Sequence, residues 1–160
     1  MVDATGNTLT YRIIGAAMAV HNALGPGHKE AVYERALGVE LDRQALAYVP
    51  QYPVEVFHAE VAVGLFYLDL LVAAQVVVKI KAFSHNLGND ELAQVINYLQ
   101  AVHAPVGLLL NFGRRRLESR RVFPSPAPGP VQRVGRNLAF HANLDLPRPP
   151  DGADDEEDEA

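Results

Sequence analysis

The spacing of apolar residues changes several times along the chain, and each change predicts a different kind of element. Helical spacing predicts a first helix, capped by Thr8 or Thr10 and running to about Leu24, where a Gly-Pro-Gly turn ends it. It predicts a second helix over about Lys29–Gln44. Asn89 is expected to cap a third helix. The core stripe expected on this third helix is Leu92, Val95, Ile96, Leu99 and Val102.

β-Branched and aromatic residues dominate the stretches between the helices and predict strands. The segment Tyr48–His58 contains Pro50 and Pro53, which limit it to an edge or bulged strand. Gly64 is expected to break the chain before a buried antiparallel hairpin over 66–72 and 76–82. Further strands are expected over 106–112 and 117–123. The order ααβββαββ favours an α/β fold, in which helices flank a central mixed sheet with a right-handed crossover.

Three charged residues interrupt the apolar hairpin. If Val72 pairs with Val76, Asp69 lies opposite Lys79, and Lys81 shares their face of the sheet. Isolated buried charges cost several kcal/mol, so these side chains need partners. The pattern alone leaves two interpretations open, a satisfied buried ion pair and a functional site.

Composition indicates one domain, and it places the acidic charge in the C-terminal tail. Hydrophobic residues make up 49% of the 160-residue chain, enough for a core over 1–123. A Pro-rich spacer with a packed arm is expected over 124–150, and a disordered acidic tail over 151–160. The tail holds seven of the 19 acidic residues and none of the basic ones. Residues 1–150 therefore contain 12 acidic and 14 basic residues. The body is therefore mildly basic, although the net charge is −5.

No part of the sequence predicts a membrane segment or a secretory signal. The apolar stretch Val61–Ala82 is interrupted by charges, and the N-terminus lacks the basic start and apolar run of a signal peptide. There is no cysteine, and the six histidines show no zinc-ligand spacing. We therefore expect a cytoplasmic protein with no membrane partner.

A basic cluster marks the last predicted hairpin. It is either a solvated hairpin face or a strip that contacts the phosphates of a nucleic acid, in which case binding should weaken steeply with salt. Its members are Arg114, Arg115, Arg116, Arg120 and Arg121.

The stretch Gly27–Tyr33, GHKEAVY, matches the motif that names the GxxExxY family. Further stretches over about Leu9–Val122 resemble the other blocks of that family in the same order. They are IIGAAMAVHNALGPG, LDLLV, VVVKIKA, QVINYL and GLLLNFG. The family resembles the PD-(D/E)xK nucleases, which have a restriction-endonuclease-like fold. The resemblance implies hydrolysis of a phosphodiester with a divalent metal, and Mg²⁺ as the cofactor of an active member.

The resemblance also implies roles for single residues. Asp69 matches the metal-binding aspartate, and Glu30 matches the helix glutamate that helps to hold the metal or its water. Lys81 matches the lysine that orients the attacking water and stabilises negative charge. Gln94 and Tyr98 match polar positions of the following helix, although Tyr98 is also expected to be a core tyrosine.

One position departs from the family pattern. Lys79 stands where the family has a metal-binding glutamate, and its ammonium repels Mg²⁺. Glu91 is a candidate for a relocated glutamate. Three hypotheses therefore stay open: a catalytically impaired nuclease-like domain that binds nucleic acid, an active Mg²⁺-dependent nuclease using Glu30, Asp69 and Lys81, and a self-assembling protein that forms homo-oligomers.

Overall fold

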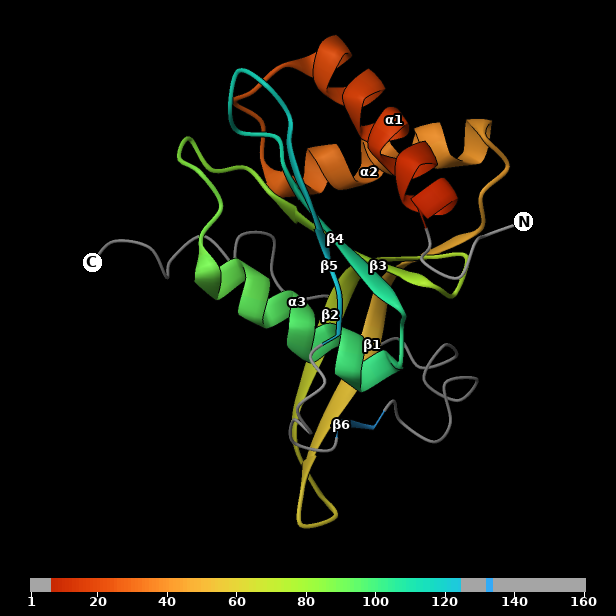
Figure 1. Cartoon of the computed structure of the whole chain (residues 1–160), viewed down its shortest axis with the longest axis vertical. Coiled ribbons are helices and arrows are strands. Elements are labelled where there is room, and N and C mark those ends of the chain that lie inside the picture. Colours follow the sequence, from red (N-terminus) through yellow and green to blue (C-terminus); the bar gives the residue numbers. More distant parts are fainter. Residues whose placement is uncertain (1–6, 125–131, 134–160) are drawn as a thin grey trace.

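The elements follow the predicted order in the computed structural model, which describes residues 7–124 and 132–133. Two helices come first and three strands follow them (Figure 1). A third helix and two more strands complete the predicted set, and a two-residue strand is added at the end. The bounds are α1 Asn7–Leu24, α2 Glu30–Arg43, β1 Tyr48–His58, β2 Val61–Val72, β3 Val76–Lys81, α3 Asn89–Val102, β4 Val106–Asn111, β5 Glu118–Val122 and β6 Gln132–Arg133.

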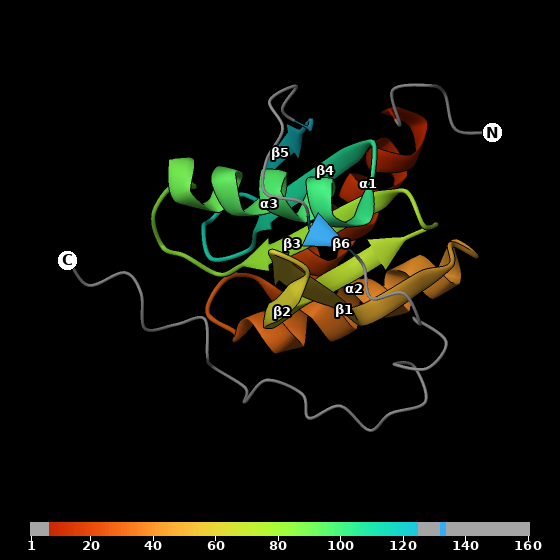
Figure 2. The same cartoon turned by 90° about the horizontal axis from the view of Figure 1, so that it is seen from below.

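Within the described residues the strands form one mixed sheet in the order β5-β4-β3-β2-β1-β6. β3 and β4 are parallel and are joined through α3, while the other neighbours pair antiparallel. Figure 2 shows α2 and α3 on opposite faces of the sheet. The mixed sheet flanked by helices confirms the predicted fold class.

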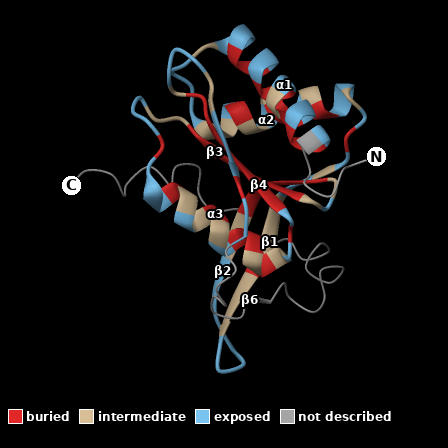
Figure 3. Ribbon diagram, viewed as in Figure 1, coloured by how far each residue is buried: buried red, intermediate tan, exposed pale blue. Residues whose placement is uncertain are grey.

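Two apolar cores follow from these two faces. The first joins α1 and α2 to alternate residues of β3 and β4, including Val78, Ile80 and Leu108. The second joins α3 to the opposite face, including Val77, Leu109 and Leu99. Burial is concentrated in these central strands, and the far end of the β1–β2 hairpin is exposed (Figure 3).

Some local predictions are wrong. Gly64 does not break the chain, because β2 runs through it; the register instead shifts beside it, where Val56 pairs with Gly64, Phe57 pairs with Ala62 and Val63 of β2 is the extra residue. α1 begins at Asn7, so Thr8 and Thr10 lie inside the helix and neither is its N-cap; the buried Thr10 hydroxyl instead accepts a hydrogen bond from Arg121 (2.8 Å). The N-cap of α3 is Gly88 instead of Asn89.

The predicted C-terminal regions lie almost wholly outside the described residues. The exception is β6, which pairs with Glu55 and Val56 of β1. The predicted Pro-rich spacer, packed arm and acidic tail therefore stay predictions. In the described part of the chain, none of the helices is both long and apolar enough to cross a membrane.

Candidate functional site

Asp69 and Lys79 meet as the sequence predicts. The pairs Val72–Val76, Leu71–Val77 and Leu70–Val78 form the recorded β2–β3 register, and its next step brings Asp69 beside Lys79. The Lys79 Nζ lies 3.7 Å from Asp69 Oδ2, and the two residues are only 3% and 9% exposed. The structure thus contains a buried ion pair between neighbouring strands.

The Asp69 carboxylate also accepts a hydrogen bond from the backbone of β3. Its Oδ2 accepts a hydrogen bond of 2.7 Å from the Ile80 backbone N–H. A charged acceptor makes a stronger hydrogen bond than a neutral one, so this contact fixes the carboxylate at the edge of the paired region. Asp69 is therefore held by a backbone donor and by a side-chain cation at once.

Glu34 and Gln51 extend this site, although neither is among the residues predicted from the sequence. The β1–β2 register places Gln51 opposite Asp69, and Gln51 has a φ of +52°. Its amide donates to both carboxylate oxygens of Glu34, at 3.1 and 3.0 Å. Glu34 lies one helical turn after Glu30, and this spacing was the available signal for it. Gln51 gives no comparable signal, because a positive φ is unusual for glutamine.

The charges of the Asp69–Lys79 ion pair affect the pKa of the Glu34 carboxyl. Burial raises the pKa of the Glu34 carboxyl above its ordinary value. The Gln51 hydrogen bond lowers this pKa, the negative charge of Asp69 raises it, and the positive charges of Arg35 and Lys79 lower it. The pKa of Glu34 therefore responds to the charges of both Asp69 and Lys79.

Lys81 has a different environment from Lys79. It is buried, and its Nζ lies 5.2 Å from the centre of the Phe83 ring. This geometry is a cation–π contact. Within residues 7–124, Lys81 forms no ion pair, so its charge stays uncompensated by a carboxylate.

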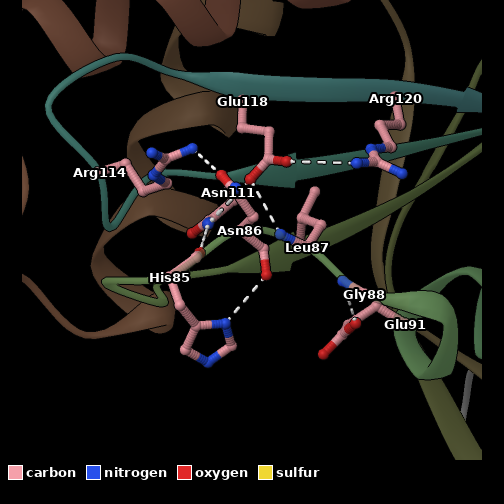
Figure 4. A network of polar contacts seen from close by, with 9 residues as sticks. All are labelled: His85, Asn86, Leu87, Gly88, Glu91, Asn111, Arg114, Glu118 and Arg120. Carbon is pink, nitrogen blue, oxygen red and sulfur yellow. Dashed lines mark hydrogen bonds and ion pairs between the residues drawn. The ribbon is translucent and has the colours of Figure 1, made fainter.

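A polar network fixes the loop between β3 and α3 (Figure 4). The buried Asn111 side chain accepts from the backbone N–H groups of Phe83 (2.9 Å) and Gly113 (3.1 Å), and donates to the His85 carbonyl (3.0 Å). Glu118 accepts from the Leu87 N–H at 3.0 Å. Arg114 donates to the Asn86 side chain. The sequence offered one signal for Asn111, a polar residue at the end of an apolar strand.

The other predicted site residues have varied positions. Glu30 is the first residue of α2 and is half-buried. Tyr98 is buried and stacks on Phe66, with ring centres 4.6 Å apart, so it packs in the core as expected. Gln94 is half-buried on the same helix, and its side chain makes no hydrogen bond within the described residues. The Glu91 carboxylate accepts from the Gly88 N–H at 2.7 Å, which gives it a helix-capping role.

The arginine cluster does not form one continuous strip. Arg120 lies 3.8 Å from Glu118, on the face of the Asn111 network. Arg121 reaches Thr10 of α1 instead. Because successive strand residues point to opposite faces, only part of the cluster can meet one ligand. Arg114, Arg115 and Arg116 are exposed in the turn before β5.

The residues of this site do not fit a bound Mg²⁺ ion. Mg²⁺ requires hard oxygen ligands around it, and here the Lys79 ammonium lies beside the expected aspartate ligand. In the part of the chain that the structure describes, no group of three or more His, Cys, Asp or Glu residues is arranged to hold a metal. The charge beside Asp69 in this structure is thus the Lys79 ammonium.

Comparison with known proteins agrees with this fold. The family model of the PD-(D/E)XK nuclease superfamily matches residues 7–122, so the chain belongs to that superfamily. Among curated proteins, none matches. The crystal structure of SSO0001 is similar, with a TM-score of 0.48 and 14% identity. The similarity covers 76% of this chain and 63% of SSO0001, so this chain spans less than two thirds of that protein.

Proposed function

We propose that this chain is a PD-(D/E)XK domain of the GxxExxY type that binds nucleic acid and has lost metal-dependent cleavage. One observation carries the proposal: the Lys79 ammonium lies 3.7 Å from Asp69, in a buried position. A cation built into the chain there neutralises the carboxylate that would otherwise bind a metal ion. Glu30 and Asp69, the remaining candidate ligands, then serve the internal charge balance of the domain.

The proposal also explains why positive charge is retained near the site. Lys81 has no carboxylate partner within the described residues, and its ammonium is suited to a phosphate group. The exposed residues Arg114, Arg115 and Arg116 lie in the turn before β5, and Arg114 contacts the loop that follows Lys81. A phosphate backbone that passes this turn would meet its exposed arginines, and the buried Lys81 adds positive charge close to the loop that Arg114 contacts.

Metal binding and cleavage test the loss of catalysis. We expect no saturable Mn²⁺ binding by the wild type in calorimetry, and no cleavage of single- or double-stranded DNA or RNA. Lys79→Glu restores the carboxylate of the family pattern and should gain measurable Mn²⁺ binding. Asp69→Asn in the Lys79→Glu background is the matched control and should abolish that gain. Cleavage by the wild type that Mn²⁺ activates and Asp69→Asn removes would establish the active-nuclease alternative.

Salt dependence tests nucleic-acid binding. Fluorescence anisotropy with labelled oligonucleotides should give an affinity that falls steeply with salt, because phosphate contacts release counterions. Arg115→Glu with Arg116→Glu should weaken binding about tenfold or more at low salt and reduce the salt slope by about one per lost contact. Arg35→Glu with Arg43→Glu, at two exposed positions of α2, makes the same charge change away from this turn and is the control.

A third outcome would favour the self-assembly alternative. It is a defined oligomer in light scattering together with no retention of any oligonucleotide. The exposed apolar residues Val61, Val63 and Leu65 of β2 would then be the first contacts to mutate. A monomer that binds oligonucleotides supports the proposed function instead.

A further inference from the structure

We infer that the loop after β3 carries a nucleobase-stacking site, formed by the His85 ring on Phe83 beside Lys81. This inference rests on the proposed function and specifies how the domain would hold a nucleic acid. The ligand class is a single-stranded segment with an unpaired base. The site lies on the loop between β3 and α3, and it adds an aromatic contact to the electrostatic ones described above.

The geometry supplies an exposed aromatic surface. The Phe83 and His85 rings are stacked, with centres 4.7 Å apart and planes inclined by 16°. Phe83 is half-buried, whereas His85 is exposed. One face of the His85 ring therefore rests on Phe83, and its exposure leaves ring surface for a ligand. In Figure 4 the His85 ring points away from the polar network.

The charged neighbours suit a nucleotide better than an apolar ligand. The Lys81 Nζ lies 5.2 Å from the Phe83 ring centre, so a cation lies directly beside the aromatic pair. Arg114 contacts Asn86, the residue that follows His85. A nucleotide offers a flat π surface and a negative phosphate together. Proteins that bind single strands combine stacking platforms and cations in this way.

The polar network keeps the platform in place before any ligand binds. Asn111 bonds the backbone on both sides of Ser84, through the Phe83 N–H and the His85 carbonyl. Glu118 holds the Leu87 N–H, so the loop is fixed at its other end as well. A loop that is already ordered loses less conformational entropy on binding. The His85 ring bonds only the adjacent Asn86 carbonyl among these groups, so the network that holds the loop does not depend on it.

A comparison of two oligonucleotides isolates the stacking contact. One is an oligothymidine about ten nucleotides long, and the other is an abasic phosphodiester chain of equal length and charge. We expect the wild type to bind the oligothymidine at least about fivefold more tightly in fluorescence anisotropy. His85→Ala should bind both oligonucleotides with the affinity of the abasic chain, while His85→Phe should retain the preference. His58→Ala removes an exposed histidine from the end of β1 and should change nothing.

The outcomes separate this inference from the proposed function. If the wild type binds neither of these chains but does bind a DNA or RNA duplex, the stacking site is overturned and the proposed function stands; if it binds no nucleic acid at all, both fail. If the wild type binds both equally, nucleic-acid binding stands and the stacking site is overturned. Equal weakening of both affinities in His85→Ala, together with a lower melting temperature, would show that the ring is only structural. Quenching of 2-aminopurine fluorescence in a bound oligonucleotide, lost in His85→Ala, would support stacking directly.

Discussion

The two faces of the sheet use the same strands for different purposes. β3 sends Val76, Val78 and Ile80 into the core beneath α1 and α2. On the face of α3 it places Lys79 and Lys81, which are buried as deeply as many apolar residues. A strand alternates its side chains, so a shift of one residue would exchange these two sets completely. The apolar face therefore fixes the register that brings the charged face together.

The polar groups of the two faces are satisfied in different ways, and this difference separates residues that affect stability from residues that also affect ligand binding. On the α1–α2 face, the Tyr33 hydroxyl is satisfied locally by the Gly25 carbonyl and the His28 N–H. On the charged face, Asp69 and Lys79 depend on each other across two strands, and their charges also act on Glu34 of α2. We expect changes in the apolar core and the Tyr33 hydroxyl of the first face to alter stability alone. Changes on the second face should alter stability and ligand binding together.

Removal of the Asp69 carboxylate should have the largest effect. Asp69→Ala takes away the anion beside the buried Lys79 and the acceptor of the Ile80 N–H. Because a buried charge is left without this compensation, unfolding in urea should show a loss of about 4 kcal/mol. The double variant Asp69→Leu with Lys79→Met should recover most of that loss. A cost below about 1 kcal/mol for the single variant would contradict the pairing.

A cavity on the opposite face should cost nearly as much and leave binding intact. Leu108 is fully buried beneath α1 and α2, and Leu108→Ala should lower the free energy of unfolding by about 3 kcal/mol. At a temperature where the variant is folded, its oligonucleotide affinity should equal that of the wild type. Leu65→Ala, at an exposed position of β2, is the control and should stay within about 0.5 kcal/mol. Weakened binding by Leu108→Ala would show that the faces are coupled.

The Asp69–Lys79 pair could be predicted because a short turn sets its register. Val72 and Val76 flank the turn, and the Gln75 N–H donates to the Val72 carbonyl at 3.0 Å. Once that turn is known, counting along both strands brings Asp69 to Lys79. The order of the elements and the core stripe of α3 followed equally from local periodicity, and the structure confirms them.

The rest of the site depends on contacts between distant segments. Gln51 reaches Glu34 from β1 across to α2, and its positive φ has no sequence signal. Asn111 lies next to Lys81 because β3 and β4 pair in parallel, a register that apolar runs alone do not determine. Gly64 shows the same limit, since pairing with β1 carries the strand through it. Local patterns thus predict elements, while the polar network requires the tertiary register.

Loss of the Tyr33 hydroxyl tests the local character of the apolar face. Tyr33→Phe keeps the ring that stacks on Phe112 and removes one hydrogen bond of 2.6 Å to Gly25 and one of 3.1 Å from His28. We expect a loss of about 1–2 kcal/mol in thermal or urea unfolding and unchanged oligonucleotide affinity. Tyr11→Phe, at a residue that is 73% exposed, should have no measurable effect. A change in affinity for Tyr33→Phe would place this tyrosine in the binding site.

The pH dependence of stability gives the smallest and most specific test of the charged face. Burial raises the pKa of Glu34 above its ordinary value of 4.5, so the folded state binds this proton more tightly than the unfolded state does. The contribution of Glu34 to stability is therefore present below its unfolded pKa and is lost as the pH rises through the raised pKa. Glu34→Gln keeps an acceptor for Gln51 and removes the titration. Its free energy of unfolding should fall less than that of the wild type between pH 4.5 and about pH 7.

Two further variants show whether this effect comes from the field of the ion pair. Glu60→Gln, at an exposed position of the β1–β2 turn, is the control and should follow the wild-type pH curve. The negative charge of Asp69 adds to the raised pKa of Glu34, so Glu34→Gln should change the pH curve less in an Asp69→Asn background than in the wild type. An equal change in both backgrounds would mean that burial alone sets the pKa of Glu34. Identical pH curves for Glu34→Gln and the wild type would mean that Glu34 ionises as it does in the unfolded chain, outside the field of Asp69 and Lys79.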